Sequence, residues 1–411
     1  MHFTIHRGTQ EIGGSCVEVW TDTTRIVLDI GMPLVEKDGS EFDFRKYQHL
    51  TVDQLISRKV LPDIKGFYTD ASKLIDGVLI SHPHVDHFGF SHFLHPEIQY
   101  YLGKATHKLI ELTGIFTPKR NVLKNYTYFE KSKPFMIGDM KITPFWMDHS
   151  GFDAYAFFIE AEGKAIFYSG DFRGHGRKNK AFKWFMHNAP ANSDYLLMEG
   201  TQIERNTQRD KTEAEIEDEP SGIFSSEDKI KLIYTSGQNI DRLVSIYRAC
   251  KRIGKTLVID VYIATVLKEL ARFASLPYPS NNFKDLKVIF SYFLCKKLTK
   301  EHKEKLLYQF RAQKITKEEI NEKQKDIVMV VRPSMKFDLE HIKNLHGGIL
   351  IYSLWEGYLK KENTKKFIDY LKNKKFKVVK IHTSGHADIE TLKEMTNIIK
   401  PNPDKPEPKK I

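Results

Sequence analysis

Apolar residues in the first 200 positions fall into short runs that are separated by turn residues. The runs have the length of β-strands, and several of them end in Gly or Asp. They occupy residues 3–8, 15–20, 24–31, 76–81, 140–147, 154–163, 164–171 and 194–200. Helices are expected between some of these runs, for example directly after residue 87. The pattern predicts a β-rich, layered α/β domain.

The pattern changes in the second half of the chain, where apolar strands alternate with helical stretches. Strands are predicted at residues 231–236, 256–261, 286–292, 326–331 and 348–354. Helices are predicted near residues 240–253, 262–275, 297–312 and 362–373. Alternation of strands and helices indicates βαβ units, and therefore a parallel sheet.

Three segments surround this alternating region. Residues 201–222 are polar, change from basic to acidic and end in Pro-Ser-Gly, which predicts a linker with one exposed helical piece. Residues 377–401 predict a further strand, a loop that carries histidines, and a helix. The tail 402–411 is rich in Pro and Lys and is expected to be mobile.

Length and composition limit the class of protein. A chain of 411 residues is too long for one ordinary core and predicts two domains or one elaborated domain. The net charge of +11 favours a polyanion such as nucleic acid as partner, although a solvated lysine surface also explains it. No apolar run is long enough to span a bilayer. Cys16, Cys250 and Cys295 are interpreted as reduced, mostly buried thiols of a cytoplasmic protein.

The stretch "SHPHVDH" at residues 81–87 places four metal-ligand side chains close together: His82, His84, Asp86 and His87. It follows a predicted strand, so the cluster lies at the carboxyl end of that strand. Histidine and aspartate are ligands for a borderline Lewis acid such as Zn²⁺. Helix-capping or core histidines rarely explain four ligand side chains at this spacing, so a metal site is the favoured interpretation.

Three further residues lie at predicted strand ends. His149 follows "ITPFWMD", Asp171 follows "AIFYSG", and Asp29 ends "TRIVLD". A carboxylate at Asp29 can bond the second nitrogen of a ligand histidine and fix its tautomer. Each residue alone is typical of a turn, but together with residues 82–87 they form a set.

These motifs resemble those of the metallo-β-lactamase superfamily. The resemblance rests on "LDIG" (28–31), "SHPHVDH" (81–87), His149 and "SGD" (169–171), whose order and approximate spacing match the four metal-binding motifs of the superfamily. The superfamily includes lactamases, thioesterases, glyoxalases and nucleases, so these motifs do not specify a reaction.

The second half narrows the resemblance to the β-CASP nucleases. "LLMEG" with Glu199 and "HTSGHA" with His386 are similar to two β-CASP motifs. "RGTQEIGGSCVEV" (7–19), "SGQNIDR" (236–242) and "VVRPSM" (330–335) look like bacterial and archaeal ribonuclease J. The resemblance implies a metallo-β-lactamase αββα sandwich with an inserted β-CASP parallel-sheet α/β domain. The expected ranges are 1–205 for the first domain, 206–375 for the insert and 376–411 for the return to the first domain.

The resemblance also implies a two-metal site that binds Zn²⁺, with Mn²⁺ as an alternative. His82, His84 and His149 would hold one ion, and Asp86 and His87 the other, with Asp171 bridging the two. Asp86 would also serve in catalysis. His386 would act as general acid with its ring held by Glu199, and His382 and Ser384 would contact phosphate.

The stretch "SGQNIDR" has a physical interpretation of its own. Ser236 or Asn239 can cap the helix that follows, and the free N–H groups at a helix start attract phosphate. A cap without a ligand fits the sequence equally well.

The resemblance ends before one family motif, a histidine on a strand after the last helix. Here "IIKP" ends at Pro401 and no histidine follows His386. We expect either that the last domain is truncated before that ligand or that this branch lacks it, and in both cases that the second ion is held less tightly. The favoured function is a ribonuclease that acts as a 5′→3′ exonuclease, an endonuclease or both. A DNA nuclease and a metal-poor nucleic-acid-binding protein with little catalysis are the alternatives. A lactamase or thioesterase is least favoured, because it would not need the insert or His386. A homodimer stays open.

Overall fold

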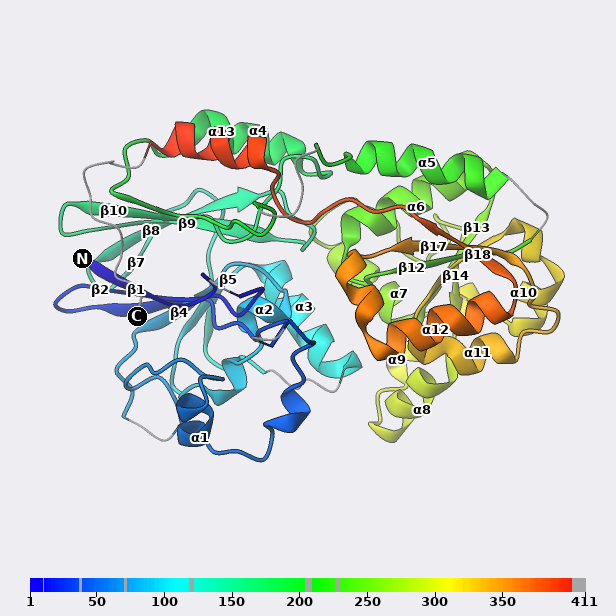
Figure 1. The fold of residues 1–411 in the computed structure, drawn as a ribbon, viewed down its shortest axis with the longest axis horizontal. Coiled ribbons are helices and arrows are strands. Elements are labelled where there is room, and N and C mark those ends of the chain that lie inside the picture. Colours follow the sequence, from blue (N-terminus) through cyan, green and yellow to red (C-terminus); the bar gives the residue numbers. More distant parts are fainter. Residues whose placement is uncertain are drawn as a thin grey trace. The chain divides into compact units, whose positions relative to one another are not determined.

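The computed structural model describes residues 1–9, 11–36, 39–69, 72–117, 122–203, 209–225 and 229–400. The chain divides into two compact units. Unit 1 comprises Met1–Gly174, Lys178–Arg209 and Gly385–Ile411, and unit 2 comprises His175–Arg177 and Asp210–Ser384. The tail 402–411 lies outside the described residues. Figure 1 labels the elements of both units.

Unit 1 contains two sheets and five helices within its described residues. The six-stranded sheet has the order β1 (His2–Arg7), β2 (Cys16–Trp20), β3 (Arg25–Leu28), β4 (Gly77–Ile80), β5 (Tyr100–Leu102) and β6 (Tyr126–Tyr128). The five-stranded sheet has the order β11 (Tyr195–Leu197), β10 (Lys164–Tyr168), β9 (Ala154–Ala161), β8 (Met140–Met147) and β7 (Phe135–Ile137). The helices are α1 (Val52–Ser57), α2 (Val85–Phe88), α3 (Lys104–Phe116), α4 (Asn179–Asn188) and α13 (Ile389–Ile399).

Strand directions decide which strand ends meet at one edge of each sheet. In the six-stranded sheet, β3, β4, β5 and β6 are parallel neighbours. In the five-stranded sheet, β9 is antiparallel to both β8 and β10, and β11 is parallel to β10. Strands β8, β10 and β11 therefore run in one direction, and their carboxyl ends lie at the same edge.

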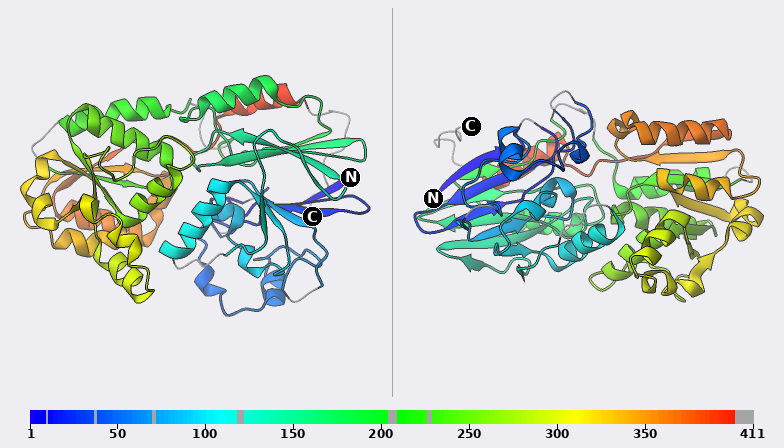
Figure 2. Two further views of the ribbon diagram at one scale, coloured as in Figure 1. Left: turned by 180° about the vertical axis from the view of Figure 1, so that it is seen from behind. Right: turned by 90° about the horizontal axis from the view of Figure 1, so that it is seen from below.

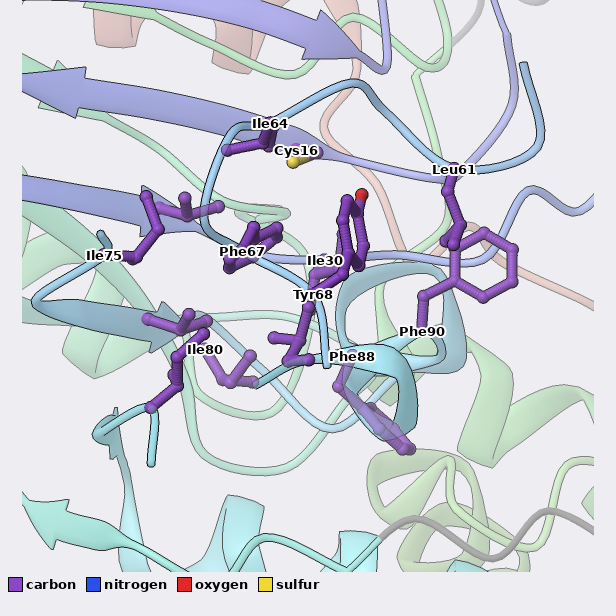
Figure 3. Close-up of a cluster of buried hydrophobic side chains, with 14 of the residues drawn as sticks. Cys16, Ile30, Leu61, Ile64, Phe67, Tyr68, Ile75, Ile80, Phe88 and Phe90 are labelled. Carbon is purple, nitrogen blue, oxygen red and sulfur yellow. The ribbon is translucent and has the colours of Figure 1, made fainter. Parts of the chain in front are cut away.

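Three apolar clusters give unit 1 its layers. Side chains alternate across each strand, so Ile26 of β3 packs between the two sheets while its neighbour Val27 packs on the outer face. The outer face of the six-stranded sheet is covered by a cluster that includes Phe67, Tyr68 and Phe88, which Figure 3 shows in close-up. The outer face of the five-stranded sheet is covered by α4 and α13, which lie side by side in Figures 1 and 2. This arrangement confirms the predicted α/β sandwich.

Phe67→Ala is expected to lower the free energy of unfolding by about 3–5 kcal/mol, the usual cost of emptying a buried phenylalanine site. Phe67 is fully buried in the outer cluster of the six-stranded sheet. The exposed Met136 on β7 is the matched control, because its truncation to alanine should change stability by less than about 0.5 kcal/mol. Urea unfolding measures both variants, and equal midpoints for the two would contradict this placement of the core.

Unit 2 is built on one parallel sheet. Its seven strands have the order β15 (Lys314–Ile315), β14 (Leu286–Ile289), β13 (Thr256–Asp260), β16 (Ile327–Val331), β12 (Lys231–Thr235), β17 (Gly348–Ser353) and β18 (Phe376–Lys380). Every neighbouring pair is parallel. All five residues of β16 are buried, as expected for a strand that is covered on both faces. The parallel sheet that the sequence predicted is confirmed.

Helices separate these strands along the chain. They are α5 (Glu213–Ser225), α6 (Ile240–Arg252), α7 (Val261–Leu270), α8 (Tyr292–Lys300), α9 (Lys305–Tyr308), α10 (Lys317–Glu322), α11 (Lys336–Glu340) and α12 (Glu362–Asn373). The start and the end of the long segment of unit 2, Asp210–Ser384, are joined by a hydrogen bond. Thr383 Oγ1 donates it to the carbonyl oxygen of Lys211. Among the described residues, no helix combines the length and apolar character that a bilayer crossing requires.

The structure corrects two helix predictions. The helical piece within 201–222 is not exposed: α5 buries Ile216, Pro220 and Phe224, which recur every four residues and share one face. The helix predicted at 297–312 is broken, because His302 adopts a positive φ of 53° and ends α8 before α9 begins. Residues 204–208 of the predicted linker lie outside the described residues.

Two boundaries also differ from the prediction. The return to the first domain was expected at residue 376, but β18 pairs with β17 and completes the sheet of unit 2. The helix expected after residue 87 begins earlier, at Val85, and ends at Phe88. The three cysteines are free thiols, of which Cys16 and Cys250 are buried and Cys295 is half-buried.

Candidate metal centre

The candidate side chains of unit 1 follow the carboxyl ends of strands. Asp29 follows β3, the histidine motif at 82–87 follows β4, His149 follows β8, Asp171 follows β10, and Glu199 follows β11. Within each sheet these strands run in the same direction, so their carboxyl ends lie at one edge. The sheet directions therefore bring together residues that are far apart in the sequence.

The side chains form three groups whose possible ligand atoms all lie within 4.8 Å of one another. The groups are His82, His84 and His149; His82, His87 and Asp171; and Asp171, Glu199 and His386. His82 joins the first group to the second, and Asp171 joins the second to the third. Asp171 Oδ2 lies 3.2 Å from His87 Nε2 and 3.8 Å from His82 Nε2, while His149 Nε2 lies 3.1 Å from His84 Nδ1.

The chemistry of these residues fits a divalent cation. His82 Nε2 is buried and has no hydrogen-bond partner among the described residues. Burial lowers the pKa of His82 and of His149 well below the usual value, so both rings are neutral and keep a lone pair. A buried lone pair without a partner is costly, and neutral imidazole nitrogens together with carboxylate oxygens are the ligands that Zn²⁺ and similar ions prefer.

Asp29 holds the ring of His87. Asp29 adopts a positive φ of 58°, and its carboxylate accepts hydrogen bonds from Ser81 N and Ser81 Oγ, each at 2.7 Å. Tyr168 Oη donates to the same carboxylate at 2.7 Å. His87 Nδ1 lies 2.7 Å from Asp29 Oδ2, which leaves Nε2 directed at Asp171. Burial opposes the charged form of His87, but Asp171 and Asp29 raise its pKa well above the usual value.

His149 is oriented by the segment that returns to unit 1. Its Nδ1 donates to the carbonyl oxygen of Gly385 at 2.6 Å. A Cβ at residue 385 would lie 2.5 Å from Ser150 Oγ, so any larger residue would require the Ser150 side chain to move. The sequence did not identify Gly385, although its position directly before His386 was a usable signal.

Glu199 and His386 form a hydrogen-bonded pair. His386 Nδ1 lies 3.0 Å from Glu199 Oε2, and the other carboxylate oxygen accepts from Phe172 N at 3.1 Å and Ala387 N at 3.3 Å. Burial alone would lower the pKa of His386, but Glu199 and Asp171 raise it to about 9. Gln202 Nε2 donates to the carbonyl oxygen of His386 at 2.8 Å, a contact that no sequence motif indicated.

Asp86 is not a member of the three groups. It lies in the first turn of α2. Burial lowers the pKa of His84, and the charge of Asp86 opposes this shift; the same charge adds to the raised pKa of His386. The backbone at Asp86 is closely packed: a Cβ at Gly31 would lie 1.6 Å from the carbonyl oxygen of Asp86, and one at Gly13 would lie 2.7 Å from its Cβ. The glycines of "EIGGS" and "LDIG" therefore let the histidine motif turn against the strand ends.

The four residues predicted to bind substrate all belong to unit 2. Asn239 caps α6, because its side chain accepts from Arg242 N at 3.1 Å. Ser236 Oγ accepts from Gln238 N at 3.3 Å. The carbonyl oxygen of Ser384 lies 2.9 Å from His175 Nε2, and His382 is half-buried after β18.

Comparison with known proteins agrees with this fold. Residues 64–217 match the family model described as "Beta-lactamase superfamily domain". Ribonuclease J from Helicobacter pylori strains ATCC 700392 / 26695 and J99 / ATCC 700824 is 31% identical over 169 residues, which cover 40% of this chain and 22% of the relative. The chain carries a metallo-β-lactamase superfamily domain. Over the matched part, it is ribonuclease J-like.

A solved structure extends the similarity in fold to nearly the whole chain. The crystal structure of a protein of unknown function from Enterococcus faecalis V583 has a TM-score of 0.77 and 20% sequence identity. The match covers 97% of this chain and 92% of that chain. At this identity the likeness concerns the fold alone. The matched ribonuclease J segment spans less than a quarter of the length of those relatives.

Proposed function

We propose that this chain is a metal-dependent phosphodiesterase that cleaves RNA. The observation that carries the proposal is the continuity of the three ligand groups, which places the Glu199–His386 pair directly beside Asp171. The similarity to ribonuclease J and the net charge of +11 support a nucleic-acid substrate. In this proposal, unit 2 is the inserted β-CASP domain.

Two divalent ions, Zn²⁺ or Mn²⁺, are assigned to the joined groups. His82, His84 and His149 would hold one ion, and His87 and Asp171 would hold the other, with Asp86 as the further ligand that the sequence predicts. A bound ion of this kind lowers the pKa of water towards neutrality and offsets the charge of a phosphate. Asp29 keeps His87 in place, and the carbonyl oxygen of Gly385 does the same for His149.

The proton for the leaving oxygen comes from His386. Its Nδ1 is held by Glu199 at 3.0 Å, so Nε2 is the nitrogen that donates the proton as the bond between phosphorus and the leaving oxygen breaks. Glu199 is a positioning residue, because its second oxygen ties the ring to Phe172 N and Ala387 N. The product carries a 5′-phosphate. His382, Ser384, Ser236 and Asn239 contact the phosphates of the strand.

A direct test compares matched 5′-phosphorylated RNA and DNA strands, incubated with Zn²⁺ or Mn²⁺ and followed by product mapping. Cleavage of RNA is expected, and the product lengths separate exonuclease from endonuclease action. Cleavage of DNA alone would replace the proposal with a DNA nuclease. Binding of RNA without cleavage by the metal-loaded chain would favour a binding protein with little catalysis.

Binding of RNA is expected to weaken steeply as the salt concentration rises. Lysine and arginine side chains that neutralise phosphates release counterions, so log Kd should rise linearly with log salt. Fluorescence anisotropy of a labelled single strand between 50 and 200 mM salt (about the range over which this effect is large) measures the slope. Affinity that does not change over this range would argue for a small-molecule substrate.

A cytoplasmic location and a homodimer stay predictions from the sequence.

A further inference from the structure

Strand β6, at the edge of the six-stranded sheet, carries a group of aromatic rings. Tyr126 and Tyr128 alternate with Thr127, so they lie on one face, and their ring centroids are 5.1 Å apart. His107 of α3 packs beneath them, with centroids 4.1 Å from Tyr126 and 5.8 Å from Tyr128. His107 Nδ1 also lies 2.8 Å from Tyr128 Oη, which fixes the position of that ring.

The two tyrosines remain accessible although His107 supports them from below. Tyr126 is 42% exposed and Tyr128 is 36% exposed, whereas His107 is buried. Side chains that served only to pack α3 on the sheet would bury their rings, because exposed aromatic area contributes nothing to the core. The arrangement is a supported ring surface that faces solvent.

The surroundings of the rings are basic. Lys108 is paired with Glu111, and Lys133 is paired with Glu130. Lys104 and Lys124 are exposed and have no salt bridge to any residue that the structure describes. Lys104 Nζ lies 5.9 Å from the centroid of Tyr128. The uncompensated charge near the tyrosines is therefore positive, which complements a phosphate backbone.

The register of the sheet aligns strand β6 with the strand that leads into the metal centre, and it places the tyrosines on the same outer face as Ile80 and Leu102. Ile80 pairs with Leu102, and Leu102 pairs with Tyr128, so the three residues lie in one row across parallel strands. Two strand spacings correspond to about 10 Å. Ile80 is followed by Ser81 and His82, so Tyr128 lies level with the residues that lead into the first ligand.

We propose that Tyr126 and Tyr128, with the neighbouring lysines, form a stacking platform for the bases of single-stranded RNA next to the cleaved phosphate. The proposal rests on the proposed ribonuclease function and names how the same site holds its substrate. Aromatic faces accept any base, because every base presents a π-surface, while lysines hold the adjacent phosphates. The platform binds unpaired strands without a sequence preference, and a duplex, whose bases are already stacked, cannot use it.

The experiment measures binding of the full chain to a labelled single-stranded RNA in chelator, so that turnover does not interfere. Tyr126→Ala should weaken binding on the order of tenfold, which is the loss of one stacked base. Tyr126→Phe should bind like the unchanged chain, because it keeps the ring. Trp184→Ala removes an equally exposed aromatic ring from α4, on the outer face of the other sheet, and is the matched control.

A second strand tests stacking itself. With an RNA that lacks bases at the positions flanking the cleaved phosphate, the unchanged chain and Tyr126→Ala should bind equally, because no base is left to stack. Two results would overturn the platform. In the first, Tyr126→Ala binds intact RNA as tightly as the unchanged chain. In the second, Tyr126→Ala weakens the affinity for both RNAs by the same factor. Failure of the unchanged chain to bind RNA both in chelator and with Zn²⁺ or Mn²⁺ present would instead overturn the proposed function.

Discussion

Asp171→Ala is expected to abolish RNA hydrolysis and to lower the metal content of the chain. Asp171 Oδ2 lies 3.2 Å from His87 Nε2 and 3.7 Å from His386 Nδ1, so this one oxygen links the proposed second ion to the acid pair. Its removal takes away a ligand of that ion and leaves buried histidines without a counter-charge. Elemental analysis measures the metal per chain, and turnover of a labelled RNA measures hydrolysis. His82→Ala should likewise lose both metal and hydrolysis.

The exposed Asp53 on α1 supplies the matched control. Asp53→Ala removes the same carboxylate from unit 1 and should leave both metal content and turnover unchanged. Normal turnover in either Asp171→Ala or His82→Ala would rule out the two-metal assignment. Loss of metal together with unchanged thermal stability of the metal-free chain would show that the effect is local to the site.

The second large effect is expected at His386. His386→Ala should slow the chemical step by roughly 10²–10⁴-fold, the usual contribution of a general acid, and leave the metal content unchanged. Glu199→Gln should give a smaller loss of the same kind, because the ring keeps one hydrogen bond to residue 199 but loses the charge that raises its pKa. Single-turnover kinetics at saturating RNA isolates the chemical step from binding.

His187→Ala is the control for this experiment, since His187 is exposed on α4 and lies in the same unit. Its turnover should equal that of the unchanged chain. If His386→Ala loses metal, then His386 is a ligand through the third group, with Asp171 and Glu199, and its assignment as the proton donor is wrong.

The fold could be predicted where burial leaves a clear pattern in the sequence. Strands such as β16 are buried on both faces and appear as uninterrupted apolar runs, and their alternation with helical stretches predicted the parallel sheet. Strand β6 was missed because all three of its residues are exposed, so it has no apolar signature. The burial of α5 was missed because its face includes Glu213, whose charge is matched by the buried Arg242 rather than by solvent.

The part of the candidate site that could be predicted is the part formed by side chains whose chemistry suits a metal ion. Histidines and aspartates at strand ends are rare enough to point to a metal, and parallel strands bring those ends together. Backbone contacts give no such signal: the carbonyl oxygen of Gly385 that orients His149 belongs to a residue with no side chain. The separation of Asp86 from the ligand groups depends on how α2 turns, which the spacing of the motif alone does not fix.

The hydrogen bond between Thr383 and the carbonyl oxygen of Lys211 has a consequence for the order of folding. Glu199 and His386 are 187 residues apart, and a flexible loop of that length must lose considerable entropy before the two side chains can meet. Once unit 2 has folded, its first and last segments are already adjacent, and only a short loop remains to be closed. Closure then costs about 2 kcal/mol less, because each halving of loop length saves about 0.6 kcal/mol. Folding of unit 2 therefore favours formation of the Glu199–His386 pair, because it lowers the entropy cost of closing the loop between them.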